Sequence, residues 1–315
     1  MKNTLKIVTI VGPTASGKTG LALAIARKID GEIIGLDSRQ IYKGLPIGTA
    51  QPTAEEQATV SHHLIGFRSP NQDITAGEYA KLVFVATEDI QSRGKTPIIC
   101  GGAGLYYRAI TKGIFEGSVS DRSIRDHLEQ EYDRIGGEAL LQQLKDVDPK
   151  YAEIVHPNNR KRLVRALEIY KVTGKPPTVH FSEQSKSQTP KLELCTVRLD
   201  VEMQVLEKRI RHRTKQMIKA GWIEEVRSLL KHYSGQTLHP LDSIGYREIL
   251  RYLKGELSEN ELEDEIVLRT RQYAKRQNQW FKKETIDLVV TLTEESNIEE
   301  VSDHIIAESC SILKN

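Results

Sequence analysis

A glycine-rich segment near the start of the chain, GPTASGKT, has the spacing of a phosphate-binding loop. It matches G-x-x-x-x-G-K-[ST] in full, and it lies between an apolar run at Leu5–Val11 and a helical pattern at Leu21–Ile29. Glycines let the backbone wrap a phosphate, while amide N–H groups at a helix N-terminus face the anion. The residues expected to bind a diphosphate are Gly12, Pro13, Thr14, Ala15, Ser16, Gly17, Lys18 and Thr19.

Two side chains of this loop add charge and a metal ligand. Lys18 supplies a positive charge, and the Thr19 hydroxyl is expected to hold Mg²⁺, the one cofactor that we predict. The motif specifies a diphosphate-bearing ligand rather than ATP in particular. Asp37, which ends a strand-like run at Glu32–Leu36, is a candidate Mg²⁺ ligand, helix cap or acceptor-binding acid, so phosphoryl transfer stays open at this point.

The elements that must position these residues alternate between strand and helix. Strands are predicted at Leu5–Val11, Glu32–Leu36, Thr96–Cys100, Leu192–Leu199 and Ile286–Leu292, with helices between them. This alternation predicts an α/β fold with a parallel sheet and right-handed crossovers. Residues 116–187 are polar and helical, so we expect them to form an all-helical insertion into a core made of residues 1–115 and 188–315.

The composition narrows the class of protein. Among 315 residues, 45 Lys and Arg oppose 43 Asp and Glu, which gives a net charge of +2 and excludes a histone-like nucleic-acid binder. The last 32 residues hold eight acidic residues and one basic residue, so the rest is moderately basic. Three distant cysteines without a C-x-x-C pair fit a reducing compartment, and no apolar run is long enough for a membrane span. We expect a cytoplasmic protein without membrane association.

Further motifs extend beyond a generic phosphate loop. Besides GPTASGKT, the sequence contains DSRQIY at Asp37–Tyr42, GGAGLY at Gly101–Tyr106, HPNNRKRLVRALE at His156–Glu168, RHRTKQMIKAGWIEEV at Arg211–Val226, SIGYRE at Ser243–Glu248 and TRQYAKRQNQWF at Thr270–Phe281. With these blocks the sequence resembles the bacterial tRNA dimethylallyltransferases (tRNA isopentenyltransferases) of the IPP transferase family. One departure is Ala103, where the family's loop usually has threonine, so a hydroxyl contact is not expected there.

The resemblance implies a function and a fold. A dimethylallyl group would pass from dimethylallyl diphosphate to the exocyclic amine of the adenosine 3′ to the anticodon, and pyrophosphate would leave. The fold would be a P-loop kinase-like core with a helical insertion that contacts the tRNA anticodon stem-loop. Asp37 would be the general base, with Mg²⁺ ligation and helix capping as the competing roles. Arg213 matches a family position near the pyrophosphate and could also be a solvated helix charge.

A set of mostly basic and polar residues is expected to contact tRNA. Arginine and lysine supply salt-dependent phosphate contacts, while polar groups near Asp37 would hold the flipped adenosine. Tyr106 is expected to pack rather than stack on a base. The expected tRNA-binding residues are Asp37, Ser38, Arg39, Gln40, Gly102, Ala103, Gly104, Arg160, Arg162, Arg165, Ile244, Gly245, Tyr246, Arg247, Arg271, Lys275 and Arg276.

Two other functions compete with this one. A P-loop kinase would use Asp37 to hold a small acceptor, and an RNA-binding module would use the loop only to hold phosphates. The adjacent His62 and His63 point to different faces of any regular element, so we expect packing or hydrogen bonding rather than a metal site. We expect no obligate protein partner and a monomer.

Overall fold

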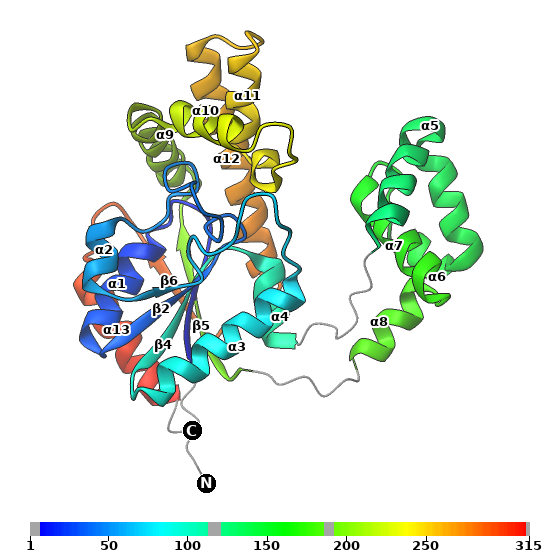
Figure 1. Cartoon of the computed structure of the whole chain (residues 1–315). Coiled ribbons are helices and arrows are strands. Elements are labelled where there is room, and N and C mark those ends of the chain that lie inside the picture. The colour runs from blue at the N-terminus through cyan, green and yellow to red at the C-terminus, as the bar shows by residue number, and fades with distance from the viewer. Residues whose placement is uncertain (1–6, 113–120, 186–191, 313–315) are drawn as a thin grey trace. The chain divides into compact units, whose positions relative to one another are not determined.

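The computed structural model describes residues 7–112, 121–185 and 192–312. It divides into two compact units, one formed by Met1–Thr111 with Lys191–Asn315 and the other by Lys112–Pro190 (Figure 1). The boundaries that we expected, at 115/116 and 187/188, lie outside the described residues. Each unit is described by itself below.

The first unit is built on a six-stranded sheet in which every pairing is parallel. Its spatial order is β3-β2-β4-β1-β5-β6, which places β1 inside the sheet. The strands are β1 (Ile7–Val11), β2 (Gly31–Leu36), β3 (His62–His63), β4 (Thr96–Gly101), β5 (Leu194–Val201) and β6 (Leu288–Leu292). The predicted parallel α/β sheet is therefore confirmed, and only the two-residue β3 was not predicted.

Helices cover both faces of this sheet. α1 (Lys18–Lys28) packs with α13 (Ile298–Ile312) on one side, and α3 (Ala76–Ser92) and α4 (Gly104–Lys112) lie on the other (Figure 1). The fully buried run of α1, Leu21–Ala26, joins β1 and β5 in the hydrophobic core. Strands buried on both faces explain why the sequence shows continuous apolar runs rather than alternation.

Four further helices group at one end of the sheet (Figure 1). They are α9 (Met203–Lys219), α10 (Trp222–His232), α11 (Tyr246–Leu253) and α12 (Glu259–Phe281). α12 begins with a capping box, because Ser258 accepts from the Glu261 amide while Glu261 accepts from the Ser258 amide at 2.8 Å. The short elements α2 (Ala54–Thr59) and η1 (His239–Asp242) complete the unit.

The second unit is helical throughout its described residues. It consists of α5 (Arg122–Val147), α6 (Pro149–Ala152), α7 (Arg160–Thr173) and α8 (Pro177–Ser185). Leucines of α5 and α7 form a separate core, with Leu128, Leu140 and Leu163 fully buried. Within α5, Gly136 has a φ of 84°, which breaks the helix direction there. This helical composition is what the polar segment 116–187 predicted.

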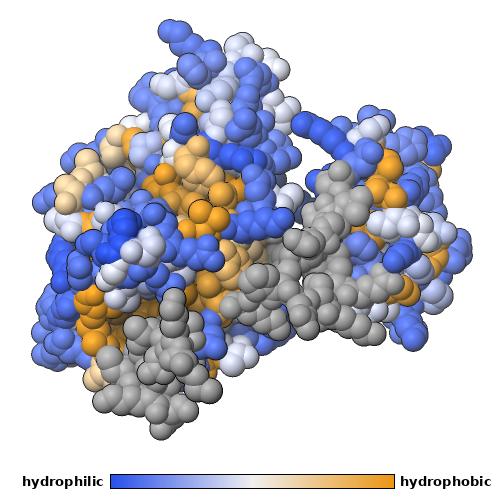
Figure 2. All heavy atoms as spheres, turned by 60° about the horizontal axis from the view of Figure 1, so that its bottom comes forward, coloured by the Kyte–Doolittle hydropathy of each residue, from blue (hydrophilic) through white to orange (hydrophobic). Residues whose placement is uncertain are grey.

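The face of the molecule shown in Figure 2 is mainly hydrophilic, with groups of hydrophobic side chains between the hydrophilic ones. Two of the most exposed large hydrophobic residues of the first unit are Val85, 63% exposed, and Leu105, 59% exposed. Among the described residues, we find no helix with both the length and the apolarity needed to span a bilayer.

Candidate functional site

A cavity of about 350 Å³ lies at the carboxyl end of β1, β2 and β4. Ligands of parallel α/β sheets bind at this edge. We call it the active-site cavity. Its lining residues are Thr14, Ala15, Ser16, Gly17, Lys18, Thr19, Gly20, Asp37, Gln40, Thr49, Ala50, Cys100, Gly101, Gly102, Arg209, Arg213, Tyr273 and Gln277. The cavity therefore joins the predicted phosphate loop, Gly12–Thr19, to Asp37 and to α9 and α12.

The phosphate loop has the backbone of an anion cradle. Ala15 has a φ of 63° and Gly17 a φ of 94°, so successive amides turn toward one side. The amides of Lys18 and Thr19 open α1, where they have no partner within the helix. At Gly12 an added Cβ would lie 3.1 Å from the Leu199 carbonyl oxygen, so the close approach to β5 requires glycine.

The Thr14 amide of the phosphate loop has its partner on another element. It donates to Oε1 of Gln277 at 2.8 Å. Thr14 also lines the active-site cavity, and its contact with the diphosphate stays a prediction. Pro13 has no N–H, and its carbonyl accepts from Nζ of Lys18 at 2.6 Å.

Two cations meet at the cavity. Burial, together with the nearby Arg213, lowers the pKa of Lys18 to about 8, while Cys100 and Asp37 oppose the shift. Burial likewise lowers the pKa of Arg213. Within the described ranges, Arg213 makes no hydrogen bond or ion pair, although burial removes most of its contact with water. An arginine desolvated without a partner is suited to receive an anionic ligand.

Among the described residues, only one of the two oxygens of the Asp37 carboxylate accepts hydrogen bonds. Its Oδ1 accepts the amides of Arg39, at 2.7 Å, and Gln40, at 3.3 Å, so it caps the turn that follows β2. No hydrogen bond to Oδ2 is present among the described residues, and the side chain lines the active-site cavity. The two amide contacts to Oδ1 therefore fix the orientation of the carboxylate, and Oδ2 can accept a proton.

The oxygen donors present fit a Mg²⁺ ion bound together with a diphosphate. Mg²⁺ is commonly held by one or two protein oxygens plus substrate phosphates. The Thr19 hydroxyl and the Asp37 carboxylate both line the cavity, and both are hard oxygen ligands. No group of three or more His, Cys, Asp or Glu is placed to hold a metal by protein ligands alone within the described residues.

The residues after Asp37 differ in how they are used. Arg39 is half-buried, and its Nη1 donates to the His239 carbonyl at 3.4 Å. The Nε2 of Gln40 donates to the carbonyls of Thr49 and Ala50, at 3.2 and 2.6 Å, and thereby holds the cavity wall. Ser38 is half-buried. Their contacts with a nucleotide stay predictions.

The glycine loop, Gly101–Gly104, packs tightly against β2. The amides of Gly102 and Ala103 both donate to the Leu36 carbonyl at 3.1 Å, and Ala103 is buried. At Gly104 an added Cβ would lie 2.4 Å from the Trp280 Nε1. These groups hold the loop in place, while their contacts with tRNA stay predictions. Tyr106 is buried and stacks on Tyr79 at 4.0 Å, which confirms its predicted packing role.

Sequence reasoning missed Gln277 as a site residue. It lies in α12 within the quoted block TRQYAKRQNQWF, and it is 7% exposed. Besides accepting from Thr14, it donates through Nε2 to the Gly102 carbonyl at 2.9 Å. The signal available in the sequence was a buried polar position one turn after Tyr273 on an otherwise charged helix.

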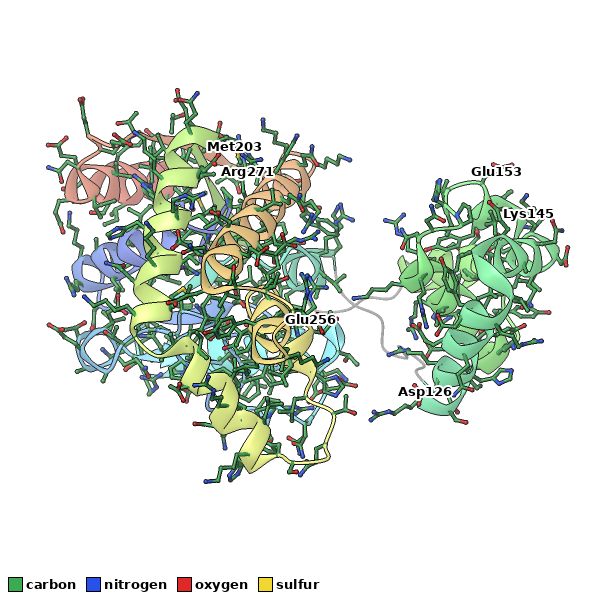
Figure 3. All side chains as sticks on the ribbon, turned by 90° about the horizontal axis from the view of Figure 1, so that it is seen from above. Asp126, Lys145, Glu153, Met203, Glu256 and Arg271 are labelled. Atoms are coloured by element: carbon green, nitrogen blue, oxygen red, sulfur yellow. The ribbon has the colours of Figure 1, made fainter. Side chains whose placement is uncertain are left out.

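The basic residues of α12 have different surroundings. Arg271 pairs with Glu207 of α9 at 2.9 Å, and Figure 3 shows Arg271 and Met203 on neighbouring helices. Lys275 and Arg276 are exposed, and the guanidinium of Arg276 lies 5.9 Å from the ring centre of Tyr273. Their contacts with tRNA stay predictions.

The aromatic residues of α12 differ in their surroundings. Tyr273 is 37% exposed and lines the active-site cavity. Trp280 is half-buried under the guanidinium of Arg108, 4.2 Å from its ring centre. Phe281 is the aromatic residue of this segment that is fully buried. The helix therefore presents Tyr273 to the site, because its position lies one turn before Gln277.

The two central residues of the Ile244–Arg247 segment, Gly245 and Tyr246, are buried and packed against neighbouring residues. Tyr246 is 1% exposed, its hydroxyl donates to Glu225 at 2.7 Å, and its ring contacts Trp222 edge-on. Gly245 is buried, with a φ of 88°. Ile244 is half-buried and Arg247 is exposed. These surroundings give Gly245 and Tyr246 a packing role, and tRNA contact by the segment stays a prediction.

The three arginines predicted in α7 belong to the second unit. Arg160 pairs with Glu129 and with Asp133, the latter at 2.5 Å, so its charge is already matched. Arg165 pairs at 2.8 Å with the fully buried Glu168. Arg162 is exposed. Their contacts with tRNA stay predictions.

The histidine pair and the cysteine at the cavity have no metal-binding arrangement. His63 contacts Glu32 at 2.7 Å, and the Nδ1 of His62 contacts the Val60 carbonyl at 2.8 Å, as the packing interpretation predicted. Loss of solvation raises the pKa of the Cys100 thiol to about 11, so it stays protonated at neutral pH.

The sequence is similar to a known protein family and to named relatives. The family model described as IPP transferase matches residues 40–284. The chain is 43% identical over 280 residues to "tRNA dimethylallyltransferase 1" of Citrifermentans bemidjiense, which covers 89% of this chain and 90% of the relative. It is 42% identical over 306 residues to "tRNA dimethylallyltransferase" of Petrotoga mobilis, which covers 96% of this chain and 99% of the relative.

Solved structures agree with the sequence comparison. The full-length tRNA isopentenylpyrophosphate transferase of Bacillus halodurans matches with a TM-score of 0.70 and 34% identity, over 98% of each chain. A eukaryotic dimethylallyltransferase solved in action on tRNA matches with a TM-score of 0.83 and 30% identity. That match covers 98% of this chain and 80% of the other.

Proposed function

The chain belongs to the IPP transferase family and transfers a dimethylallyl group to tRNA, and we propose that the donor is dimethylallyl diphosphate bound in the phosphate loop. The acceptor is the exocyclic amine of the adenosine 3′ to the anticodon, and pyrophosphate is released. The observation that carries this proposal is the meeting of the phosphate loop, Arg213 and Asp37 around one cavity.

The donor's diphosphate is the leaving group, so negative charge grows on it during the reaction. The amides that open α1, the Lys18 ammonium and the Arg213 guanidinium surround the position where that charge develops. Preorganised donors of this kind stabilise the transition state without reorganising at the moment of reaction. The Thr19 hydroxyl would hold Mg²⁺, which supplies further positive charge to the diphosphate oxygens when bound.

The acceptor amine is a weak nucleophile because its lone pair is delocalised into the adenine ring. In the proposed step its nitrogen forms a bond to C1 of the dimethylallyl group, and the C1–O bond to the diphosphate breaks. The amine proton passes to Oδ2 of Asp37, whose other oxygen is fixed by the amides of Arg39 and Gln40. Such general-base help is typically worth about 10²–10⁴ in rate.

The adenosine must leave the anticodon-loop stack to reach this cavity. Extruding a base costs a few kcal/mol, which polar and aromatic contacts must repay. Tyr273, which is part-exposed at the cavity, supplies a ring face, and the exposed Lys275 and Arg276 follow it on α12.

The three distant cysteines of the sequence support a reducing, cytoplasmic location.

The test is a transfer assay with two labelled donors. The purified chain is incubated with an unmodified tRNA anticodon stem-loop, Mg²⁺ and dimethylallyl diphosphate labelled in its C5 unit, and the nucleosides are then separated. We expect label on a single adenosine, 3′ to the anticodon. Transfer of label from γ-labelled ATP instead, with no C5 unit in the RNA, would show phosphoryl transfer and contradict the proposal.

A further inference from the structure

Gln277 connects two loops that both line the active-site cavity. Its Oε1 accepts the Thr14 amide of the phosphate loop at 2.8 Å, and its Nε2 donates to the Gly102 carbonyl of the glycine loop at 2.9 Å. The side chain is 7% exposed, and it comes from α12, far from both loops in the sequence. Three chain segments therefore meet at one amide group.

The two contacts require the two different ends of a carboxamide. The Thr14 amide needs an acceptor and the Gly102 carbonyl needs a donor, and glutamine presents both at once. A carboxylate would supply the acceptor but would place an oxygen against the Gly102 carbonyl. A methionine of similar length would leave the Thr14 amide and the Gly102 carbonyl without these partners.

The glycine loop is shaped around this side chain. A Cβ added to Gly102 would lie 2.3 Å from the Nε2 of Gln277, much closer than any real contact, while the next nearest atom, the Gly12 carbonyl oxygen, is 3.2 Å away. The absence of a side chain at Gly102 thus leaves room for the amide of Gln277. Each of the two residues limits what the other can be.

We propose that Gln277 is a positioning residue that sets the spacing between the phosphate loop and the glycine loop. This inference rests on the proposed function, because the phosphate loop holds the donor and the glycine loop borders the acceptor's place. The hydrogen bond to the Thr14 amide fixes the backbone position of the phosphate loop. The hydrogen bond to the Gly102 carbonyl fixes the position of the glycine loop relative to the phosphate loop. Together they set the distance between C1 of the donor and the acceptor amine.

The expected effect follows from how steeply transfer rates depend on geometry. A displacement of about 1 Å between reacting groups can cost about 10²-fold in rate. Loss of Gln277 should therefore lower kcat and kcat/KM for the donor, while the tRNA dissociation constant, which many contacts outside this cavity determine, stays near its original value.

The first experiment compares Gln277→Met with Gln279→Met, a matched change at an exposed position of the same helix. We expect Gln277→Met to lower kcat/KM for dimethylallyl diphosphate by about 10²-fold, with the tRNA dissociation constant within a factor of about two of the control. Gln279→Met should transfer at the original rate. If Gln277→Met lowers only the Tm and keeps the control's kcat and KM, the positioning role is wrong.

The second experiment uses the steric relation between the two residues and stays informative if Gln277→Met folds poorly. In the original chain Gly102→Ala should cost about 10²-fold in kcat, because the new methyl group collides with the amide. In a Gln277→Ala background Gly102→Ala should cost little more, because the amide is gone. Costs that simply add would contradict the proposed coupling.

A third readout is independent of activity. Hydrogen exchange of the Thr14 amide, followed by NMR, should be slow in the original chain and in Gln279→Met, and fast in Gln277→Met. Equal exchange in all three would overturn the inference. The failure of the proposed function looks different: the original chain and Gln279→Met would then both fail to transfer, whereas the exchange pattern of Thr14 would remain.

Discussion

At the scale of single residues, some groups of the site supply charge and others fix the position of the reacting side chain. Lys18 and Arg213 supply positive charge to the cavity, and desolvation lowers the pKa of each. Asp37 is oriented by two backbone amides, which leaves one oxygen for chemistry. The residues of the cradle could be predicted from the motif spacing, and Asp37 could be predicted from its place at the end of a strand-like run.

Replacement of Asp37 tests the base assignment. Asp37→Asn keeps the size of the side chain and an oxygen for the turn that follows β2, but removes the proton acceptor. We expect kcat to fall by about 10²–10⁴, with little change in the tRNA dissociation constant, measured by single-turnover transfer and by filter binding. Asp30→Asn, at the opposite end of β2, is the control. Normal turnover by Asp37→Asn would eliminate the base role.

The pKa of Lys18 predicts an alkaline limit to activity. Burial lowers this pKa to about 8, so the cation is present below pH 8 and is lost as the pH rises through that value. Accordingly, kcat/KM for dimethylallyl diphosphate should fall above about pH 8, since this parameter reports the free enzyme. In Lys18→Arg the charge persists at higher pH. Superimposable alkaline limbs for the two proteins would assign the limit to another group.

At the scale of elements, the helices α9 and α12 carry most of what sequence reasoning could not place. The strands were predictable because buried parallel strands have continuous apolar runs. Gln277 and Tyr273 were not, because helix periodicity shows which residues share a face and not which loops that face meets. The hydrogen bond from the Thr14 amide to Gln277 was not predictable for the same reason, because the two residues lie far apart in the sequence.

The exposed basic residues of α12 predict a salt-dependent interface. Lys275 is exposed, whereas Arg271 is already paired with Glu207, so Lys275 gives the cleaner test. Lys275→Glu should weaken tRNA binding and reduce the slope of log affinity against log salt by about one. Lys95→Glu, directly before the amino end of β4, is the control. Equal slopes for both variants would return α12 to a structural role.

At the scale of the whole molecule, the chain combines a parallel α/β unit with a helical unit that has its own core. The sequence predicted this division, since a polar helical stretch separates two strand-like runs. It did not predict the buried charge that holds the second unit together: Glu168 is fully buried, pairs with Arg125 and Arg165, and accepts the Asp121 amide.

The buried Glu168 tests whether the helical unit is stable independently of the first unit. Glu168→Ala breaks a buried ion-pair network, and removal of one partner of such a pair costs about 3–5 kcal/mol. Calorimetry should show a lower unfolding temperature for the second unit, while affinity for dimethylallyl diphosphate stays unchanged. Glu153→Ala, an exposed change in the same unit, is the control. Loss of donor binding in Glu168→Ala would show that the units do not act separately.

The central claim is that the phosphate loop holds a prenyl diphosphate while Asp37 takes the proton of the attacking amine. The most direct measurement is a crystal structure with an anticodon stem-loop and a non-reactive thio analogue of dimethylallyl diphosphate. The account predicts the analogue's diphosphate against the amides of Ala15–Thr19 and the adenosine amine about 2.6–3.2 Å from an oxygen of Asp37. A diphosphate bound elsewhere, or an amine out of reach of Asp37, would contradict it.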